Sequence, residues 1–409
     1  MKVARILRGA ALAVIAVSGP TFAQTDAPTR AAAARAAREA KAAVPSVHKS
    51  GRVERVLTML EIDPTIQQVL GRRDGFAARI GGIEDGAGLA IGPAWRTSTP
   101  FNGNLRMYAS AAASPADREV EGGLSMPHLR TRRLAFAVDG ASATLSQERF
   151  FGAGVQSRRI DQTTFGLARR HVRAAATITG ADWLRLSGAA GVLSTSAIDG
   201  RAPRLPGITT LFTSGDAPGI GSSATFTMLS LAATVDYRDV ALNPRRGGRY
   251  HVAVHRYAGS SADRHSFTRV DVEVEQHLAA WKRQRLLTVR GIASMSAADA
   301  GHDVPFYLQR TLGGSRLLRG FVTDRFRDRN LVALQAEYGW DVLPFLSGVL
   351  FLEGGTVAPE WRDLRVGSFR RDYGIGFRLG SARTVALRTD VALGSGEGTR
   401  VTMRFSHAF

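Results

Sequence analysis

Cysteine is absent from the 409-residue sequence, and lysine is almost absent. Without a thiol, the chain can form neither a disulfide framework nor a thiolate metal site. It also has no thiol to mispair in an oxidising compartment, which is compatible with export. Lysines account for only four of the 54 basic residues, at positions 2, 41, 49 and 282. Arginine therefore carries almost all of the positive charge.

Long apolar runs are missing after the amino terminus. The leader itself is basic, with Lys2, Arg5 and Arg8, and an apolar stretch follows from 10 to 17. Small residues at 21–23 occupy the positions that a signal peptidase reads, so we expect residues 1–23 to be a signal peptide and the mature chain to begin near Gln24. Charges and glycines keep every later apolar run below the roughly 20 residues that a spanning helix needs. These patterns argue against a helical inner-membrane protein.

The formal net charge of +19 could indicate nucleic-acid binding. The arginines, however, are scattered along the chain instead of forming one patch, and an exported protein does not meet nucleic acid in the cytoplasm. We therefore expect no nucleic-acid partner. Anionic outer-membrane lipid, including lipopolysaccharide, is the more natural counter-charge, and most arginines are expected in a solvated lumen and in loops.

Apolar and polar residues alternate with a period of two, which predicts β-strands. From 265 to 278, four apolar residues share one strand face and charged residues share the other, and similar alternation recurs over 372–380 and 382–393. If these strands cross a membrane, the apolar face meets lipid and the polar face lines a lumen. The expected lipid-facing residues include Val270, Val272 and Leu387, and the expected lumenal residues include Glu273, Arg378 and Arg388.

A soluble β-sandwich also alternates, so other features must decide between the two folds. Export, strands of about ten residues and the last segment favour an outer-membrane β-barrel. In that segment Val401, Met403, Phe405 and Phe409 share a face, with His407 as the exception. The terminal aromatics Phe405 and Phe409 resemble the assembly signal of bacterial outer-membrane proteins. We therefore expect the cell's barrel assembly machinery to insert this chain into the outer membrane.

The domain organisation follows from these patterns. Strand-like segments from Gly86 onward number about sixteen, which predicts one all-β, antiparallel, closed barrel over residues 81–409. Residues 24–80 are expected to be a periplasmic extension, partly helical or disordered. Within it, residues 29–44 are rich in alanine, and residues 53–70 have a helical apolar spacing that is interrupted at Pro64.

One stretch, LGGSRLLRGF at 312–321, has loop character within this strand-rich chain. It is followed by RFRDRNLVALQAEYGW at 325–340, GVLFLEGGTV at 348–357 and DYGIGFRLG at 372–380, and is preceded by FFGAGVQS at 150–157 and VDYRDVALNPRRGG at 235–248. Together these motifs resemble the barrel domain of the bacterial surface antigen superfamily. That family includes the central subunit of the barrel assembly machinery, the translocation and assembly module, and the two-partner-secretion transporters. The resemblance covers about residues 75–409.

The resemblance implies a lumenal loop whose motif is Leu318, Arg319, Gly320 and Phe321. In the family this loop folds back into the barrel, and its arginine meets an acidic residue of the wall, here Glu353. Phe351, Glu353 and Gly355 share one strand face, so the carboxylate is expected in the lumen beside a glycine that leaves room for the loop. Gly376 and Arg378 are expected on the facing wall of the next strand.

The residue types suit such a contact. A guanidinium can hold a carboxylate through two parallel hydrogen bonds, whereas the ammonium of lysine acts as a point charge. The family more often has aspartate where this chain has Glu353, which changes reach without changing chemistry. An alternative interpretation is that the pair only pins the loop, because buried ion pairs often fix an arrangement without adding stability.

Other candidate sites have simpler interpretations. The glycines of GAGLAIG at 86–92 open a strand with no following helix, so they do not predict a phosphate loop. His251 and His255 lie four residues apart on one strand face, about 13 Å, which is too far for one metal ion. Asp299, His302 and Asp303 form an acid–histidine cluster without a nucleophile motif. We therefore expect no enzymatic activity, no metal and no other cofactor.

Two functions remain open. The first is insertion, assembly or translocation of unfolded or secreted polypeptides, with a weak seam between the first and last strands that opens. The second is a passive channel or structural barrel in which the loop is a plug. Insertion and secretion members of the family usually carry periplasmic polypeptide-binding domains, and an intact one would not fit between Gln24 and Gly75. Whether a separate periplasmic partner supplies them stays open.

Overall fold

The computed structural model describes residues 74–83, 88–129, 133–260, 264–280, 285–380 and 385–405. The chain divides into two compact units, Met1–Thr58 and Met59–Phe409, and every described residue belongs to the second. The expected signal peptide, nearly all of the expected extension at 24–80 and the terminal Phe409 lie outside the described residues.

The described chain forms one sixteen-stranded sheet and one small two-stranded sheet, and every pair of adjacent strands is antiparallel. The first half of the large sheet contains β1 (Gly75–Gly81), β2 (Ala90–Thr97), β3 (Arg106–Ala113), β4 (Arg118–Met126), β5 (Leu134–Phe150), β6 (Thr163–Ala181), β7 (Leu184–Asp199) and β8 (Ser223–Asp236). The second half contains β9 (Gly247–Gly259), β10 (Phe267–Ala280), β11 (Arg285–Ala298), β14 (Asn330–Leu343), β15 (Leu346–Ala358), β16 (Arg370–Gly380), β17 (Val385–Gly394) and β18 (Gly398–Phe405). The small sheet pairs β12 (Arg310–Leu312) with β13 (Phe326–Asp328).

Helical structure in the described residues is confined to short 3-10 turns. These are η1 (Arg159–Asp161), η2 (Ile208–Thr210), η3 (Phe306–Leu308), η4 (Trp361–Asp363) and η5 (Val366–Ser368). None of the described helices has the length and apolar character that a membrane span requires. The all-β, sixteen-stranded antiparallel architecture expected from the alternation is confirmed.

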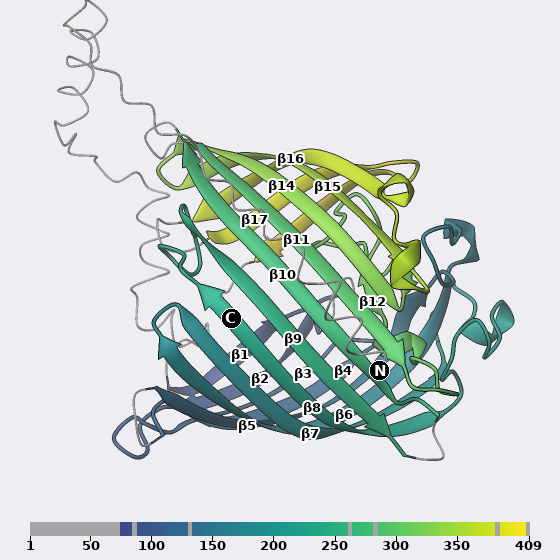
Figure 1. Cartoon of the computed structure of the whole chain (residues 1–409), viewed down its shortest axis with the longest axis horizontal. Coiled ribbons are helices and arrows are strands. Elements are labelled where there is room, and N and C mark those ends of the chain that lie inside the picture. Colours follow the sequence, from purple (N-terminus) through teal and green to yellow (C-terminus); the bar gives the residue numbers. More distant parts are fainter. Residues whose placement is uncertain are drawn as a thin grey trace, which may run out of the picture. The chain divides into compact units, whose positions relative to one another are not determined.

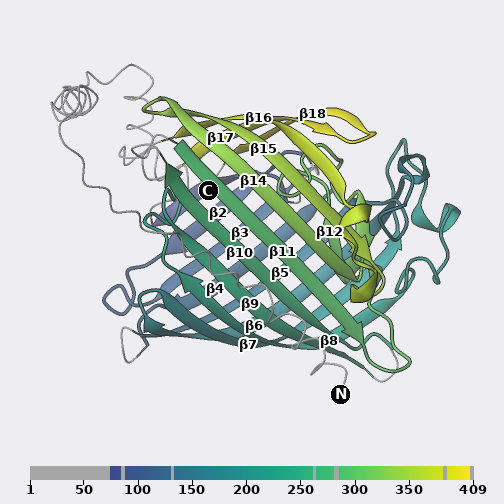
Figure 2. The ribbon, with the colours of Figure 1, turned by 45° about the horizontal axis from the view of Figure 1, so that its top comes forward.

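The large sheet curls around a lumen. In Figure 1 the strands run diagonally across the wall, and in Figure 2 strands β10, β11 and β14 cross in front of the strands of the opposite wall. Strands β1 and β18 are the two edges of the sheet, and no register joins them in the described part of the chain. We call this junction the seam; its closure by strand pairing remains a prediction. Strand β1 begins at Gly75, earlier than the barrel start expected at residue 81.

Side-chain exposure follows the alternation that was expected. In β10, Val274 and Leu278 are 41% and 50% exposed, and Val272 is half-buried on the same face. On the opposite face, Glu273 accepts a hydrogen bond from Arg290 Nε at 2.8 Å. Val270 differs from the expectation, because it shares the face of Val274 but is only 1% exposed. Its side chain is covered, so the expected lipid contact of Val270 is wrong.

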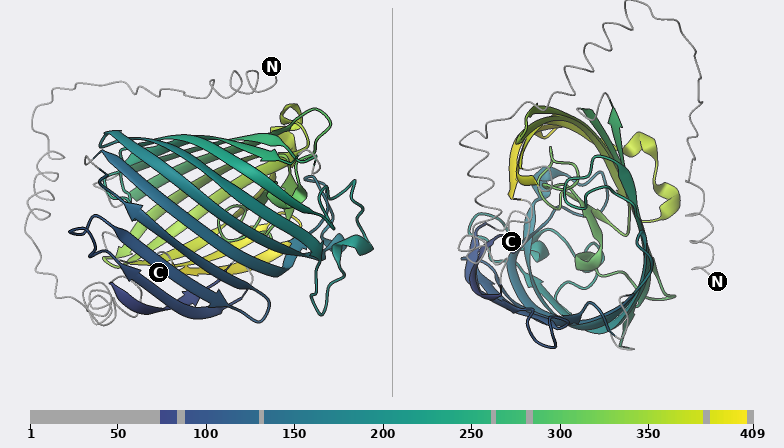
Figure 3. Two further views of the ribbon diagram at one scale, coloured as in Figure 1. Left: turned by 90° about the horizontal axis from the view of Figure 1, so that it is seen from below. Right: turned by 90° about the vertical axis from the view of Figure 1, so that its left-hand side faces the viewer.

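The β11–β14 connection, residues 299–329, enters the lumen (Figure 3). Phe306 in η3 packs edge-to-face against Phe150 and Phe165 of the wall, with ring centroids 5.2 and 4.7 Å apart. A second cluster joins Val304 of the connection to Phe226 and Phe267. Apolar packing of this kind is non-directional and strong, at about 1.5–3 kcal/mol for each large side chain fully buried. Apolar contacts therefore hold the connection against the wall, in addition to any contact between charged groups.

Candidate lumenal loop site

The loop motif sits in a tight turn. The amide of Phe321 donates to the carbonyl of Leu318 at 3.0 Å, and Leu318 has a φ of 54°. A left-handed backbone is unfavourable for leucine, so the surrounding structure must hold it. Leu318 is 1% exposed and packs in a cluster with Phe321 and the wall. The members of this cluster are Leu312, Leu318, Phe321, Phe326, Leu331, Ala333 and Val357.

Arg319 and Glu353 meet as the resemblance implied. Glu353 Oε1 accepts a hydrogen bond from Arg319 Nε at 2.8 Å and lies 2.7 Å from Nη2, while Oε2 accepts one from the backbone amide of Arg319 at 2.8 Å. Gln335 Nε2 donates to Oε1 at 2.6 Å. Arg319 is 4% exposed and Glu353 is 2% exposed. The extra methylene of glutamate is thus compatible with a close, two-pronged contact.

Two further carboxylates surround the same guanidinium. Arg319 Nη2 donates to Glu337 Oε1 at 2.6 Å, and Nη1 donates to Asp390 Oδ2 at 3.2 Å. Arg378 shares both acids, at 2.5 Å from Asp390 and 3.5 Å from Glu337. Burial alone would lower the pKa of Arg319, but the charges of Glu337, Glu353 and Asp390 raise it above its usual value. The group stays charged and links the loop to β14, β15 and β17.

Glu337 and Asp390 were missed at the level of sequence. Alternation places both on the lumenal face, but their convergence depends on strand register. Glu337 pairs with Phe351, and Asp390 pairs with Gly376. The signal that could have found them is this register, which aligns inward residues of neighbouring strands into rows across the wall.

The aromatic ring of Phe351 forms the floor of the site. The guanidinium carbon of Arg319 lies 3.6 Å from the ring centroid, a cation–π contact shielded from water. Gly374 lies under this ring, and a Cβ there would collide with Phe351 and with the carbonyl of Val391. The small residue in β16 therefore makes space for the ring that supports the arginine.

The loop backbone also touches the wall directly. The amide of Gly320 donates to Asp372 Oδ2 in β16, and Gly320 packs against Gly394 at the end of β17. A Cβ on Gly320 would lie 2.5 Å from the Gly394 nitrogen and 2.9 Å from the Asp372 Cβ. Only a residue without a side chain fits this approach.

The other wall glycines have comparable surroundings. A Cβ on Gly355 would lie 3.0 Å from Leu312 Cδ1, so the loop occupies the space that this glycine leaves. A Cβ on Gly376 would collide with the carboxylate of Asp390.

Phe405 ends β18, and Phe409 lies outside the described residues, so the proposed assembly signal remains a prediction.

The motif at 150–157 lies against the lumenal connection. Arg325 donates to the hydroxyl and the carbonyl of Ser157 at 2.9 and 2.7 Å, and its Nε lies 2.5 Å from Glu397. The amide of Gly154 donates to the carbonyl of Arg327 at 2.8 Å. This contact network ties the β5–β6 loop, the connection and the β17–β18 turn together.

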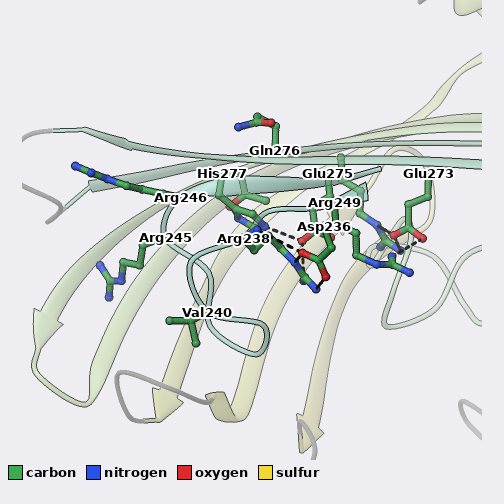
Figure 4. A network of polar contacts seen from close by, with 12 residues as sticks. Asp236, Arg238, Val240, Arg245, Arg246, Arg249, Glu273, Glu275, Gln276 and His277 are labelled. Atoms are coloured by element: carbon green, nitrogen blue, oxygen red, sulfur yellow. Dashed lines mark hydrogen bonds and ion pairs between the residues drawn. The ribbon is translucent and has the colours of Figure 1, made fainter. Parts of the chain in front are cut away.

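The motif at 235–248 forms the β8–β9 turn (Figure 4). Arg238 Nε and Nη2 donate to the Asp236 carboxylate at 2.9 and 2.8 Å. Arg245 donates to both oxygens of Asp341 in β14, at 2.8 and 2.7 Å. The turn therefore extends over the sheet from β9 to β14, and several of its residues line a cavity in the lumen.

A cavity of about 1680 Å³ occupies the lumen between this turn and the loop motif. Its lining includes Arg319 and Glu337 of the loop site, and also residues of both seam strands, from Ala77 to Gly81 in β1 and Met403 and Arg404 in β18. The cavity thus adjoins the arginine site on one side and the seam on the other.

The side chains of the acid–histidine cluster and of the histidine pair considered above form hydrogen bonds within the barrel. Asp299 accepts two hydrogen bonds from Arg256, at 2.9 and 2.6 Å, and His302 Nδ1 accepts one from the amide of Ser266 at 3.1 Å. His251 and His255 each bond a hydroxyl of β8 at 2.8 Å. Within the described residues no group of acids and histidines could hold a metal ion.

Comparisons with known proteins identify the fold and the family of the chain. Comparison with curated protein sequences gives no match. The chain is similar to the crystal structure of BamA from Haemophilus ducreyi lacking POTRA domains 1-3, with a TM-score of 0.60 and 10% identity over 81% of this chain and 71% of that one. It is also similar to CdiB from Escherichia coli, with a TM-score of 0.53 and 13% identity over 80% of this chain and 61% of that one. At these identities the likeness shows the fold alone, and this chain spans less than two thirds of CdiB. The Omp85 superfamily domain matches residues 140–407, well over half of the sequence, and the chain belongs to that superfamily.

Proposed function

We propose that this protein acts in the insertion, assembly or translocation of polypeptides at the bacterial outer membrane. The observation that carries the proposal is the Arg319 site, which joins the lumenal loop to β14, β15 and β17 near the seam. A loop that only plugs a passive pore has no need to bind the wall strands that lead to the sheet edge.

The seam supports the same role. Edge strands expose unpaired backbone donors and acceptors, and an extended polypeptide can add to them as a further strand. The loop reaches this edge, because Arg404 of β18 donates to the carbonyl of Ser315 at 3.1 Å. A client polypeptide that pairs with a strand at the seam would therefore contact wall strands that the loop holds in place.

The remaining parts of the proposal concern delivery and surroundings. Residues 1–23 would direct export, the residues from 24 to the start of β1 at Gly75 would lie in the periplasm, and the cell's barrel assembly machinery would insert the sheet that follows into the outer membrane. Lipid and lipopolysaccharide would surround the apolar outer face.

Reconstitution tests the proposal. The purified chain in liposomes should accelerate membrane insertion of an unfolded outer-membrane barrel protein, and Arg319→Ala should abolish the acceleration by releasing the loop. Arg173→Ala is the matched control, since Arg173 pairs with Asp139 at 2.9 Å on the lumenal wall, away from the loop. If the unmodified protein accelerates no insertion and Arg319→Ala merely raises single-channel conductance, the passive-channel alternative is correct.

A further inference from the structure

Three arginines form one row on the lumenal wall beside the seam. Strand register places Arg388 of β17 directly opposite Arg378 of β16 on one side and Arg404 of β18 on the other. All three line the lumen cavity. Like charges directly opposite each other on neighbouring strands destabilise a sheet. A negatively charged group bound beside these three arginines would reduce this repulsion.

Two members of the row have partners. Arg378 is held by Asp390 and Glu337, and Arg404 donates to the carbonyl of Ser315. Arg388 differs from both. Its Nε is buried and finds no hydrogen-bond acceptor, and its guanidinium joins no ion pair in the described part of the chain.

The acids around the cavity are already engaged. Glu121 pairs with Arg79 at 3.0 Å, Glu275 with His277 at 2.7 Å, and Glu337 and Asp390 with Arg319 and Arg378. Asp341 is held by Arg245. The acids that line the cavity therefore do not balance the charge of Arg388, and the cavity lies beside its guanidinium.

The position of the row narrows the kind of anion. On β18, Val401 lies on the face opposite Arg404 and is 65% exposed, whereas Arg404 lines the cavity. A lipid phosphate would approach the outward face, while a chain paired with a sheet edge could extend a carboxylate into the lumen. Carboxylates also match the forked donors of arginine in two parallel hydrogen bonds.

We propose that the row centred on Arg388 binds a carboxylate, at the chain end or on an acidic side chain, of a polypeptide client paired with the seam. This inference rests on the proposed function and names the chemistry of its client. An edge strand of the opened seam would supply backbone pairing, and the arginine row would supply selection for a negative group on the lumenal side.

Peptide binding to the purified full chain in detergent tests the inference. The probes are three fluorescent peptides of about ten residues with the same alternating apolar sequence: one has a free terminal carboxylate, one has a terminal amide, and one has a terminal amide and an internal glutamate. Both carboxylate peptides should bind about tenfold more tightly than the uncharged one, as expected for charge-assisted hydrogen bonds.

Variants assign the preference to the row. Arg388→Gln should remove the tenfold preference, and Arg388→Lys should restore only part of it, because lysine keeps the charge but lacks the fork. Arg290→Gln is the control, since Arg290 lines the same cavity but is paired with Glu273 at 2.7 Å. Heat-modifiable mobility on gels verifies that each variant is folded; should Arg388→Gln fail to fold, the lysine variant decides alone.

Several results would overturn the inference. They are equal binding of all three peptides to the unmodified protein, a preference that survives at Arg388→Gln or is undiminished in Arg388→Lys, or a preference for vesicles of anionic phospholipid that depends on Arg388 while the peptides show none. Client insertion by the unmodified protein is measured in parallel. Insertion without carboxylate preference refutes only this inference, whereas absence of insertion refutes the proposed function.

Discussion

Arg319 differs from a simple salt-bridge partner because three carboxylates converge on it. Removing it leaves Glu337, Glu353 and Asp390 close together with Arg378 as their neighbour, whereas removing Glu353 leaves two acids to balance the arginine. The two ends of the contact are therefore not equivalent. Its energetic role is asymmetric even though its geometry is a close pair.

This asymmetry gives a first prediction. Arg319→Ala should destabilise the loop by about 3–5 kcal/mol, the range for stranding buried charge, and Glu353→Ala should cost less. The double variant should be little worse than Arg319→Ala, because the second change removes a charge that is already stranded. Protease cleavage within 299–329 and urea unfolding measure the effects. Strictly additive losses would contradict direct contact.

Gly320 provides a second prediction with a matched control. Gly320→Ala places a methyl group against the backbone of Gly394 and should cost about 1–3 kcal/mol through overpacking. Gly367→Ala should be nearly neutral, because a Cβ there meets nothing within 4 Å. Loop protease sensitivity compares them, and equal sensitivity would mean that the loop does not approach β17 so closely.

Asp328, in β13 of the lumenal connection, gives a prediction for pH. Burial raises the pKa of this carboxyl in the folded protein. The folded state therefore binds the proton more tightly than the unfolded state, and stability should fall as pH rises from the ordinary aspartate pKa through the raised one. Asp328→Asn should flatten this part of the profile in urea unfolding at a series of pH values. An unchanged slope would argue against a titrating Asp328.

Among the elements, β10 shows how a strand separates two environments. Val274 faces outward with 41% exposure, and its neighbours Glu273 and Glu275 hold basic partners inside. We predict that Val274→Arg costs about 2–4 kcal/mol in lipid. Ala175→Arg, on the face that carries the His171 and Arg173 contacts with Asp139, should be nearly neutral. Unfolding in bilayers compares the two, and equal costs would contradict the assigned faces.

Strands were predictable from sequence because their signal is local. A period of two survives in β10, β16 and β17 whatever the rest of the chain does. The covering of Val270 and the early start of β1 at Gly75 were not predictable in this way. The Arg319–Glu353 contact came from resemblance, while Glu337 and Asp390 needed the register of four strands and the path of a loop, which local periodicity does not encode.

For the whole molecule, delivery to the membrane rests on the chain end. We predict that removing Phe409, or replacing it with a charged residue, impairs membrane assembly by taking the terminal aromatic from the last strand's apolar face. The amount of heat-modifiable barrel in purified outer membranes measures this. An internal control is Tyr373→Ser, which removes an exposed aromatic from β16 without touching the chain end. Undiminished barrel without Phe409 would rule out the assembly signal.

The contact of Gly320 with Gly394 also imposes an order on biogenesis. The connection at 299–329 precedes β14–β18 in the chain, yet its anchors at Asp390, Gly394, Glu397 and Arg404 belong to the last hairpin. Contacts between distant segments form only after the intervening chain has been arranged. The loop therefore reaches its final position only after β17 and β18 have joined the sheet, and its docking marks a sheet that already contains these two strands.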